Sequence, residues 1–202
     1  MDWTHLLAFN ATLLAALASP GPAMLIALQA TLTGGRSQGI RTGLGLAIMA
    51  SVWTGMALLG LDAIFALFPW AYVSAKVVGA LYLIWLAVKM WRTARAPLDP
   101  PEQGKFARHA IVTGLTANLA NPKSMLFAAS VLVVIFPPTL GLADKALIVG
   151  NQLLVECVAY TCFATALSTP PARAGYLRLK PQFDRTAAVI LGALGMRLIF
   201  TK

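Results

Sequence analysis

Long apolar stretches separated by short polar gaps dominate this chain of 202 residues. An α-helix needs about 20 apolar residues to cross the hydrocarbon core of a bilayer, so stretches of this length predict transmembrane helices. Six stretches qualify, although the last is shorter than the others and a count of five stays open. They cover residues 6–32, 42–61, 70–91, 110–136, 146–167 and 186–200.

Two of these stretches carry helix-breaking residues in their interior. Ser19-Pro20-Gly21-Pro22 interrupts the first, and Asn121-Pro122-Lys123 interrupts the fourth. Proline lacks a backbone donor and clashes with the preceding turn, so each group predicts a broken helix. The freed peptide groups cannot face lipid and must be buried in protein or line a wet cavity. A half-helix that begins there would attract anionic groups such as a carboxylate, unless the prolines are kinks that serve packing only.

The two breaks also relate the two halves of the chain. Each lies in the first apolar stretch of its half and is followed by Met-Leu. A proline-rich linker, residues 94–107, separates a first repeat of about residues 1–93 from a second of about 108–202. Three spans per half is an odd number, so related tandem halves must lie in opposite orientations in the membrane. We interpret residues 1–202 as one all-α transmembrane domain, with six transmembrane helices as two inverted three-helix repeats and with helices 1 and 4 broken.

Composition agrees with a membrane protein. Hydrophobic residues make up 58% of the chain and charged residues only 11%, whereas soluble domains carry about 25% charged residues. So apolar a chain is not disordered, and one aqueous globule of this size could not bury that much apolar surface.

The net charge of +9 is distributed as membrane topology requires. The basic residues do not form one amphipathic face with stacking aromatics, which argues against nucleic-acid binding. They gather in the gaps after the first, third and fifth stretches, while Lys145 and Lys202 are almost alone on the other side. The positive-inside rule makes the basic side cytoplasmic, so six spans place both termini on the outer side.

Two charged residues fall inside apolar stretches. Lys123 follows the second break directly, and Glu156 lies about ten residues into the fifth stretch. A charge at bilayer depth is costly unless it meets water, a partner or a cavity. Lys123 is expected to hold a substrate carboxylate or to pair with Glu156. Glu156 in a low-dielectric site suits a proton-coupling role, and a static Lys123–Glu156 pair that only stabilises the bundle is the alternative.

Two asparagines complete the candidate site. Asn118 and Asn121 are three residues apart and share a helix face, where they would bind substrate or re-satisfy the broken backbone. Glu156 is the candidate proton-coupling residue. The candidate substrate-binding residues are Ser19, Pro20, Gly21, Pro22, Asn118, Asn121, Pro122 and Lys123.

With these residues the chain resembles the LysE-type amino-acid exporters, specifically the homoserine/threonine exporter branch. The resemblance implies a bacterial inner-membrane efflux protein for amino acids or their derivatives, driven by the proton-motive force. The chain has no Walker motif, in agreement with a transporter that does not use ATP. It departs from the family at residues 50–53, where members often carry a polar or acidic group. The matching segments are residues 19–22, 35–43, 79–83, 118–123 and 192–198.

Other function classes fit the residues less well. A thiol–disulfide carrier needs a reactive cysteine in each repeat, but Cys157 and Cys162 share one stretch. His5, His109 and the cysteines do not cluster along the chain, so a metal site is not expected, although efflux of a metal ion or another small solute stays the alternative function. No Ser–His–Asp set or HExxH motif predicts an enzyme, and no cofactor is expected.

Glycines predict close helix packing at two places. Gly39-x-x-x-Gly43 offers one small-residue face, and Gly192 with Gly195 offers another. Each face would pack within one bundle or form the seam of a homodimer. The expected partners are therefore an amino-acid substrate, the lipid bilayer and, at most, a second copy of the chain.

Overall fold

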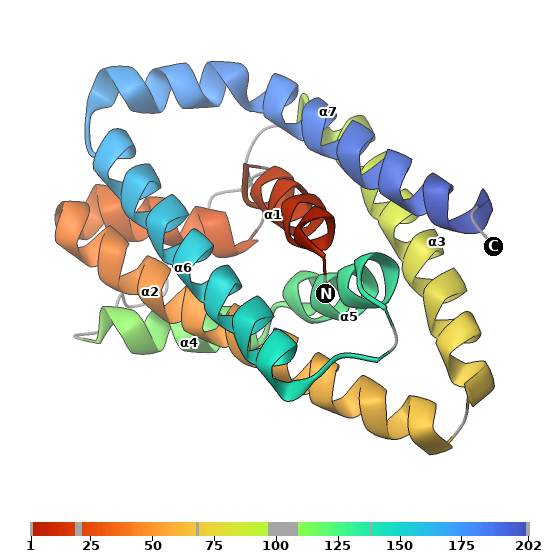
Figure 1. Cartoon of the computed structure of the whole chain (residues 1–202). Helices are drawn as coiled ribbons and strands as arrows, with labels where there is room; N and C mark the ends of the chain where they lie inside the picture. The colour runs from red at the N-terminus through yellow and green to blue at the C-terminus, as the bar shows by residue number, and fades with distance from the viewer. Residues whose placement is uncertain (1, 19–21, 68, 97–108, 138, 201–202) are drawn as a thin grey trace.

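The computed structural model describes residues 2–18, 22–67, 69–96, 109–137 and 139–200. The described residues form seven α-helices and no strand, which confirms the all-α prediction for this part of the chain. In Figure 1, α1 and α5 lie in the middle of the view, framed by α2, α3, α6 and α7. The helices are α1 (Trp3–Ala18), α2 (Pro22–Leu67), α3 (Pro69–Thr93), α4 (Ala110–Leu119), α5 (Pro122–Ile135), α6 (Leu142–Leu167) and α7 (Pro170–Phe200).

Helices end and begin at both predicted breaks. The first helix, α1, ends at Ala18 and α2 begins at Pro22, so Ser19, Pro20 and Gly21 lie outside the described residues. The second break separates α4 from α5, which begins at Pro122 and is bent by 65° from α4. Proline suits both helix starts, because its missing N–H would have no partner in a first turn.

The polar gap predicted after the first apolar stretch is helical in the structure, except at a single glycine. Helical geometry continues to Gly34, and Gly35 alone departs from it, with φ 75° and ψ 179°. This backbone conformation is essentially restricted to glycine. The chain folds back there, and as a result the backbone of Gly39 packs against the side chain of Thr31. The label α2 therefore covers two helices that meet at Gly35.

We expect Gly35→Ala to lower the free energy of unfolding by about 1–3 kcal/mol, because alanine is strained at this φ and ψ. Gly60→Ala, which also lies in α2, is the matched control. A Cβ at either glycine meets no atom of the described residues within 4 Å, so the two positions differ in backbone conformation and not in space. Thermal unfolding of the purified protein in detergent would check this, and equal midpoints for the two variants would contradict it.

Length and composition mark part of the described chain as membrane-spanning. Two segments are long and apolar enough to cross a bilayer by length and composition, Ala23–Gly60, which contains the turn at Gly35, and Leu142–Leu167. The bent pair α4 and α5 makes a third candidate span. The helices α3 and α7 cover the third and sixth predicted stretches but do not meet this criterion, so the count of six stays a prediction. A face of α3 nevertheless suits lipid, since its large apolar side chains are exposed: Trp70, Val73, Val77, Val78, Leu81, Trp85, Val88 and Trp91.

The last helix begins earlier than the apolar pattern predicts. The stretch at 186–200 is preceded by a polar segment, yet α7 is helical from Pro170 and contains Pro181. Lys180 and Asp184 are buried charged residues of this segment, and Lys180 joins it to α3. Its ammonium donates to the carbonyl oxygens of Thr93 (3.4 Å) and Ala94 (3.1 Å) at the end of α3, and pairs with Asp184 at 3.0 Å. A lysine favours the negative end of a helix, so these contacts join α7 to α3.

Both predicted glycine faces pack within the chain. The backbone of Gly43 lies against the Tyr160 side chain in α6, where a Cβ would come within 2.5 Å of the Tyr160 Cβ. At the other face, a Cβ on Gly195 would lie 2.9 Å from the Ala80 carbonyl oxygen in α3. A third close crossing was not predicted: Gly45 in α2 and Gly114 in α4 bring these two backbones into contact.

Candidate functional site

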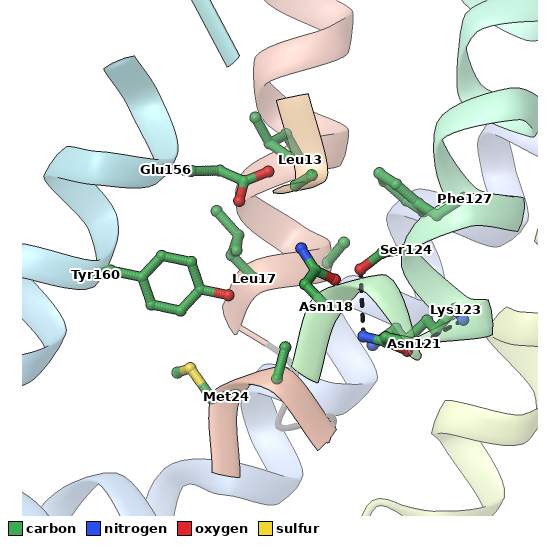
Figure 2. Close-up of a pocket in the computed structure, with 13 residues that line it drawn as sticks. Leu13, Leu17, Met24, Asn118, Asn121, Lys123, Ser124, Phe127, Glu156 and Tyr160 are labelled. Carbon is green, nitrogen blue, oxygen red and sulfur yellow. Dashed lines mark hydrogen bonds between the residues drawn. The ribbon is translucent and has the colours of Figure 1, made fainter. Parts of the chain in front are cut away.

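A pocket of about 70 Å³ lies where the two helix breaks meet. This volume holds several water molecules, since one water needs about 10–15 Å³ of such space. Leu17 and Ala23 reach it from either side of the first break, while Asn121 and Lys123 reach it from the second. Figure 2 shows the side chains that line it. They are Leu13, Ala16, Leu17, Ala23, Met24, Ala50, Asn118, Asn121, Lys123, Ser124, Phe127, Glu156 and Tyr160.

Asn121 caps the helix that begins at the second break. Its side-chain oxygen accepts a hydrogen bond from the backbone N–H of Lys123 (3.1 Å), and its Nδ2 donates to the Ser124 hydroxyl (3.2 Å). The Ser124 N–H donates to the Asn121 carbonyl oxygen (3.1 Å). Asparagine is a preferred N-cap for this reason. The first N–H groups of α5 therefore already have acceptors, and the expectation of free donors for an anion at this helix start does not hold.

Asn118 sits at the end of α4 with only 2% of its surface exposed. Its Nδ2 donates to the Leu46 carbonyl oxygen in α2 at 2.7 Å, and its own backbone carbonyl accepts from the Trp53 indole at 3.3 Å. The side-chain oxygen Oδ1 is buried and has no hydrogen-bond partner among the described residues. A buried acceptor without a donor costs about 1–3 kcal/mol. Asn118 thus uses one end of its amide for structure and leaves the other as an acceptor in the wall of the pocket.

Glu156 in α6 is 3% exposed and is held by a neutral partner. The Gln152 side-chain amide donates to its Oε1 at 2.9 Å. Glu156 and Lys123 lie on opposite sides of the pocket (Figure 2), and no ion pair joins them in the described part of the chain. The static Lys123–Glu156 pair, one of the alternatives from the sequence, is therefore absent. A buried carboxylate without a cationic partner favours taking up a proton or a cation.

Lys123 is also within electrostatic reach of charged residues that do not line the pocket. Asp184 in α7 and Lys89 in α3 are the charged residues that act on it electrostatically. Asp184 is paired with Lys180, so the pocket is connected through Lys123 to the ion pair that joins α7 to α3. Lys123 itself is half-buried and makes no side-chain hydrogen bond among the described residues.

The structure brings together four of the residues that the sequence predicted. Asn118, Asn121, Lys123 and Glu156 all line the pocket. Pro22 and Pro122 are placed as the first residues of α2 and α5, and only their backbone is described. The remaining predicted residues, Ser19, Pro20 and Gly21, are those outside the described part of the chain.

Sequence reasoning missed Ser124, Tyr160 and Gln152. Gln152, Glu156 and Tyr160 are spaced four residues apart in an otherwise apolar stretch, and all three are buried. Such spacing places polar side chains on one face of a helix, so the pattern was available in the sequence. Ser124 lies beside the asparagine cap, and its hydroxyl is fixed by Asn121.

Comparison with known proteins gives a consistent result. The family model described as LysE type translocator matches residues 14–202. The threonine efflux protein of Escherichia coli (strain K12) is 32% identical over 194 residues, which cover 93% of each chain. The homoserine/homoserine lactone efflux protein of Salmonella typhimurium is 32% identical over 129 residues, which cover 63% of this chain and 60% of that one. No solved structure matches the chain.

Proposed function

The chain belongs to the LysE type translocator family, and we propose that it exports small amino acids or their derivatives across the bacterial inner membrane in exchange for protons. The observation that carries the proposal is the pocket at the two helix breaks. It combines a buried carboxylate, an amide oxygen without a partner among the described residues, and a lysine in a wall that also holds apolar side chains. A zwitterion needs this pairing of opposite charges across a small space.

Each charged end of an amino acid has a partner in the pocket. The Glu156 carboxylate and the Asn118 Oδ1 are acceptors for the α-ammonium group. Lys123, on the opposite side, provides positive charge for the α-carboxylate (Figure 2). The α-carboxylate is thereby assigned to a side chain, because the Asn121 cap has used the first N–H groups of α5.

The small volume of the pocket, about 70 Å³, favours a small substrate side chain. Ala16, Ala23 and Ala50 contribute little more than methyl groups, while the hydroxyls of Ser124 and Tyr160 lie in the same pocket. The relatives named for threonine and homoserine efflux are named for amino acids that carry a hydroxyl group. We therefore include hydroxylated amino acids among the expected substrates.

Glu156 also provides a physical reason for proton coupling. One carboxylate cannot neutralise a proton and an ammonium ion at the same time, so the two compete for it. Competition at a single site that opens alternately to the two sides couples entry of the proton to exit of the amino acid. The gradient then drives export without ATP.

Alternating access requires two parts of the protein that move against each other. The order of elements supports a division into two repeats, because a short helix, a break at proline, a second short helix and two long helices occur twice. The first set is α1, the two parts of α2, and α3; the second set is α4, α5, α6 and α7. We propose that these are inverted repeats, that the basic gaps face the cytoplasm and that both termini are periplasmic.

Export of a panel of amino acids from cells with and without the protein tests the proposal. Intracellular accumulation and resistance to inhibitory amino acids or analogues would be measured, with threonine, homoserine and homoserine lactone in the panel. We expect export of at least one small hydroxylated amino acid, and its collapse when an uncoupler removes the proton gradient. If no amino acid in the panel is exported but a metal ion is, the proposed substrate class is wrong.

Lys123→Ala is expected to weaken the apparent affinity for the exported amino acid by about tenfold to a hundredfold. A hydrogen bond to a charged group contributes about 1.5–3 kcal/mol, and this variant removes the charge that faces the α-carboxylate. Lys145→Ala is the control, since Lys145 lies in the first turn of α6 and does not line the pocket. Concentration-dependent export into inverted vesicles gives the affinity, and an unchanged KM in Lys123→Ala would exclude Lys123 from the site.

A further inference from the structure

Behind Glu156, a chain of side-chain hydrogen bonds crosses between two helices. The Thr54 hydroxyl in α2 donates to the Gln152 Oε1 in α6 at 2.6 Å, and the Gln152 Nε2 donates to the Glu156 Oε1 at 2.9 Å. Thr54 is 0% exposed and Gln152 is 5% exposed. Neither residue lines the pocket, so neither is part of the substrate site described above.

Thr54 differs from other threonines of the chain in where its proton goes. Thr12, Thr31 and Thr93 each donate to the carbonyl oxygen four residues earlier in their own helix. This is the common arrangement for threonine inside a helix. Thr54 donates across the helix interface instead. Its hydroxyl is therefore committed to Gln152 and not to its own backbone.

The Gln152 amide points its oxygen at Thr54 and its nitrogen at Glu156. An amide has one acceptor end and one donor end. Because the oxygen accepts from Thr54, the nitrogen must face Glu156 and can only donate to it. Because Nε2 can only donate, the Glu156 Oε1 must accept this hydrogen bond and therefore carries no proton. Oε2 is then the oxygen that remains for a proton or an ammonium ion.

We infer that Gln152 is a positioning residue that, held by Thr54, orients the Glu156 carboxylate and reserves its Oε2 for the exchanged proton or substrate. The inference rests on the proposed function for the identity of what binds, but the orientation itself does not. Packing alone gives no reason for the hydrogen bonds from Thr54 to Gln152 and from Gln152 to Glu156, since two apolar residues of similar shape would fill the interface at little cost. The other titratable groups near Glu156 are Cys157 and Tyr160 in the same helix and Lys123 across the pocket, and none of these is hydrogen-bonded to the Glu156 side chain among the described residues.

Labelling of Glu156 by a hydrophobic carbodiimide tests the inference without any substrate. The reagent attacks protonated carboxyl groups in apolar surroundings, and mass spectrometry of the purified protein locates the adduct. Loss of a hydrogen bond to the ionised form favours the protonated form. Gln152→Leu is therefore expected to be labelled about tenfold faster than the natural protein at a pH where the natural carboxyl group is mostly ionised. Thr54→Val should change in the same direction, and Thr54→Ser, which keeps the hydroxyl, should behave like the natural protein.

The neighbouring Asn151 provides the matched control. It forms a reciprocal amide pair with Asn10 in α1, at 2.7 and 3.3 Å, and so joins two helices without being bonded to Glu156. Asn151→Leu removes an inter-helix polar contact one residue from Gln152. We expect it to leave the pH dependence of labelling unchanged, whatever it does to stability.

Two outcomes would overturn the inference. One is Gln152→Leu and Thr54→Val labelled at the natural rate over the whole pH range. The other is Asn151→Leu altering the labelling as much as Gln152→Leu does, because the effect would then be loosened packing. Export assays separate this result from the proposed function. If the natural protein exports no amino acid but the labelling follows the expected order, the orientation of Glu156 stands and the assigned substrate falls.

Discussion

Glu156→Gln is expected to reduce gradient-driven export by about a hundredfold or more while the protein stays folded. Glutamine has the shape of glutamate and keeps a side-chain oxygen to accept from Gln152. It carries no charge for the α-ammonium group and takes up no proton. Loss of one partner from a buried charge pair costs about 2–5 kcal/mol, which corresponds to this loss of rate.

Stability separates this effect from misfolding. The Glu156 carboxylate is 3% exposed and has no cationic partner in the described part of the chain, so its charge is a cost to the folded state. The neutral variant should therefore unfold at the same temperature as the natural protein or above it. A static structural role predicts the reverse, with a lower unfolding temperature and export lost in proportion to folded protein.

Export into inverted membrane vesicles, normalised to the amount of folded protein, measures the effect. Asp144→Asn is the control, because Asp144 is a carboxylate in the first turn of the same helix and does not line the pocket. It should export at the natural rate. Undiminished gradient-driven export in Glu156→Gln would remove Glu156 from the coupling mechanism.

The sequence was most informative where a residue was out of place in lipid. Proline in an apolar stretch predicted both breaks, and charge in an apolar stretch identified Lys123 and Glu156, which line one pocket. The reason is general, because each such residue is costly in a membrane unless the fold compensates for it. Of the two roles predicted for Asn121, satisfying the broken backbone is the one that its contacts show. Asparagine before a proline is a helix-start signal, and Asn121 indeed caps α5.

Contacts between helices were beyond the sequence pattern. Whether Glu156 would pair with Lys123 or with a neutral residue depends on which faces of α5 and α6 meet, and a single sequence does not contain that information. The partner proved to be Gln152, one turn away, fixed in turn by Thr54 from α2. The turn at Gly35 was also hidden, since nothing in the pattern shows which of two adjacent glycines takes a positive φ.

The crossing of α2 and α4 gives the second large effect. These helices pack backbone to backbone: a Cβ on Gly114 would overlap the Thr42 carbonyl oxygen and lie 2.8 Å from the Leu46 nitrogen. Backbone atoms cannot move aside as a flexible side chain can. One turn further along α4, Asn118 donates to the Leu46 carbonyl oxygen. Separation of the two helices would therefore also displace Asn118 from the pocket.

Gly114→Ala is accordingly expected to destabilise the protein by about 3 kcal/mol or more and to leave little folded material in the membrane. Gly150→Ala is the matched control, because Gly150 lies in α6 and a Cβ there meets no atom within 4 Å. Alanine favours a helix over glycine by about 1 kcal/mol. The control should thus be as stable as the natural protein or slightly more stable, so the same glycine-to-alanine change destabilises the protein at one position and not at the other. Thermal unfolding and folded yield in detergent measure both effects. If Gly114→Ala unfolds at the same temperature as Gly150→Ala, α2 and α4 do not cross this closely.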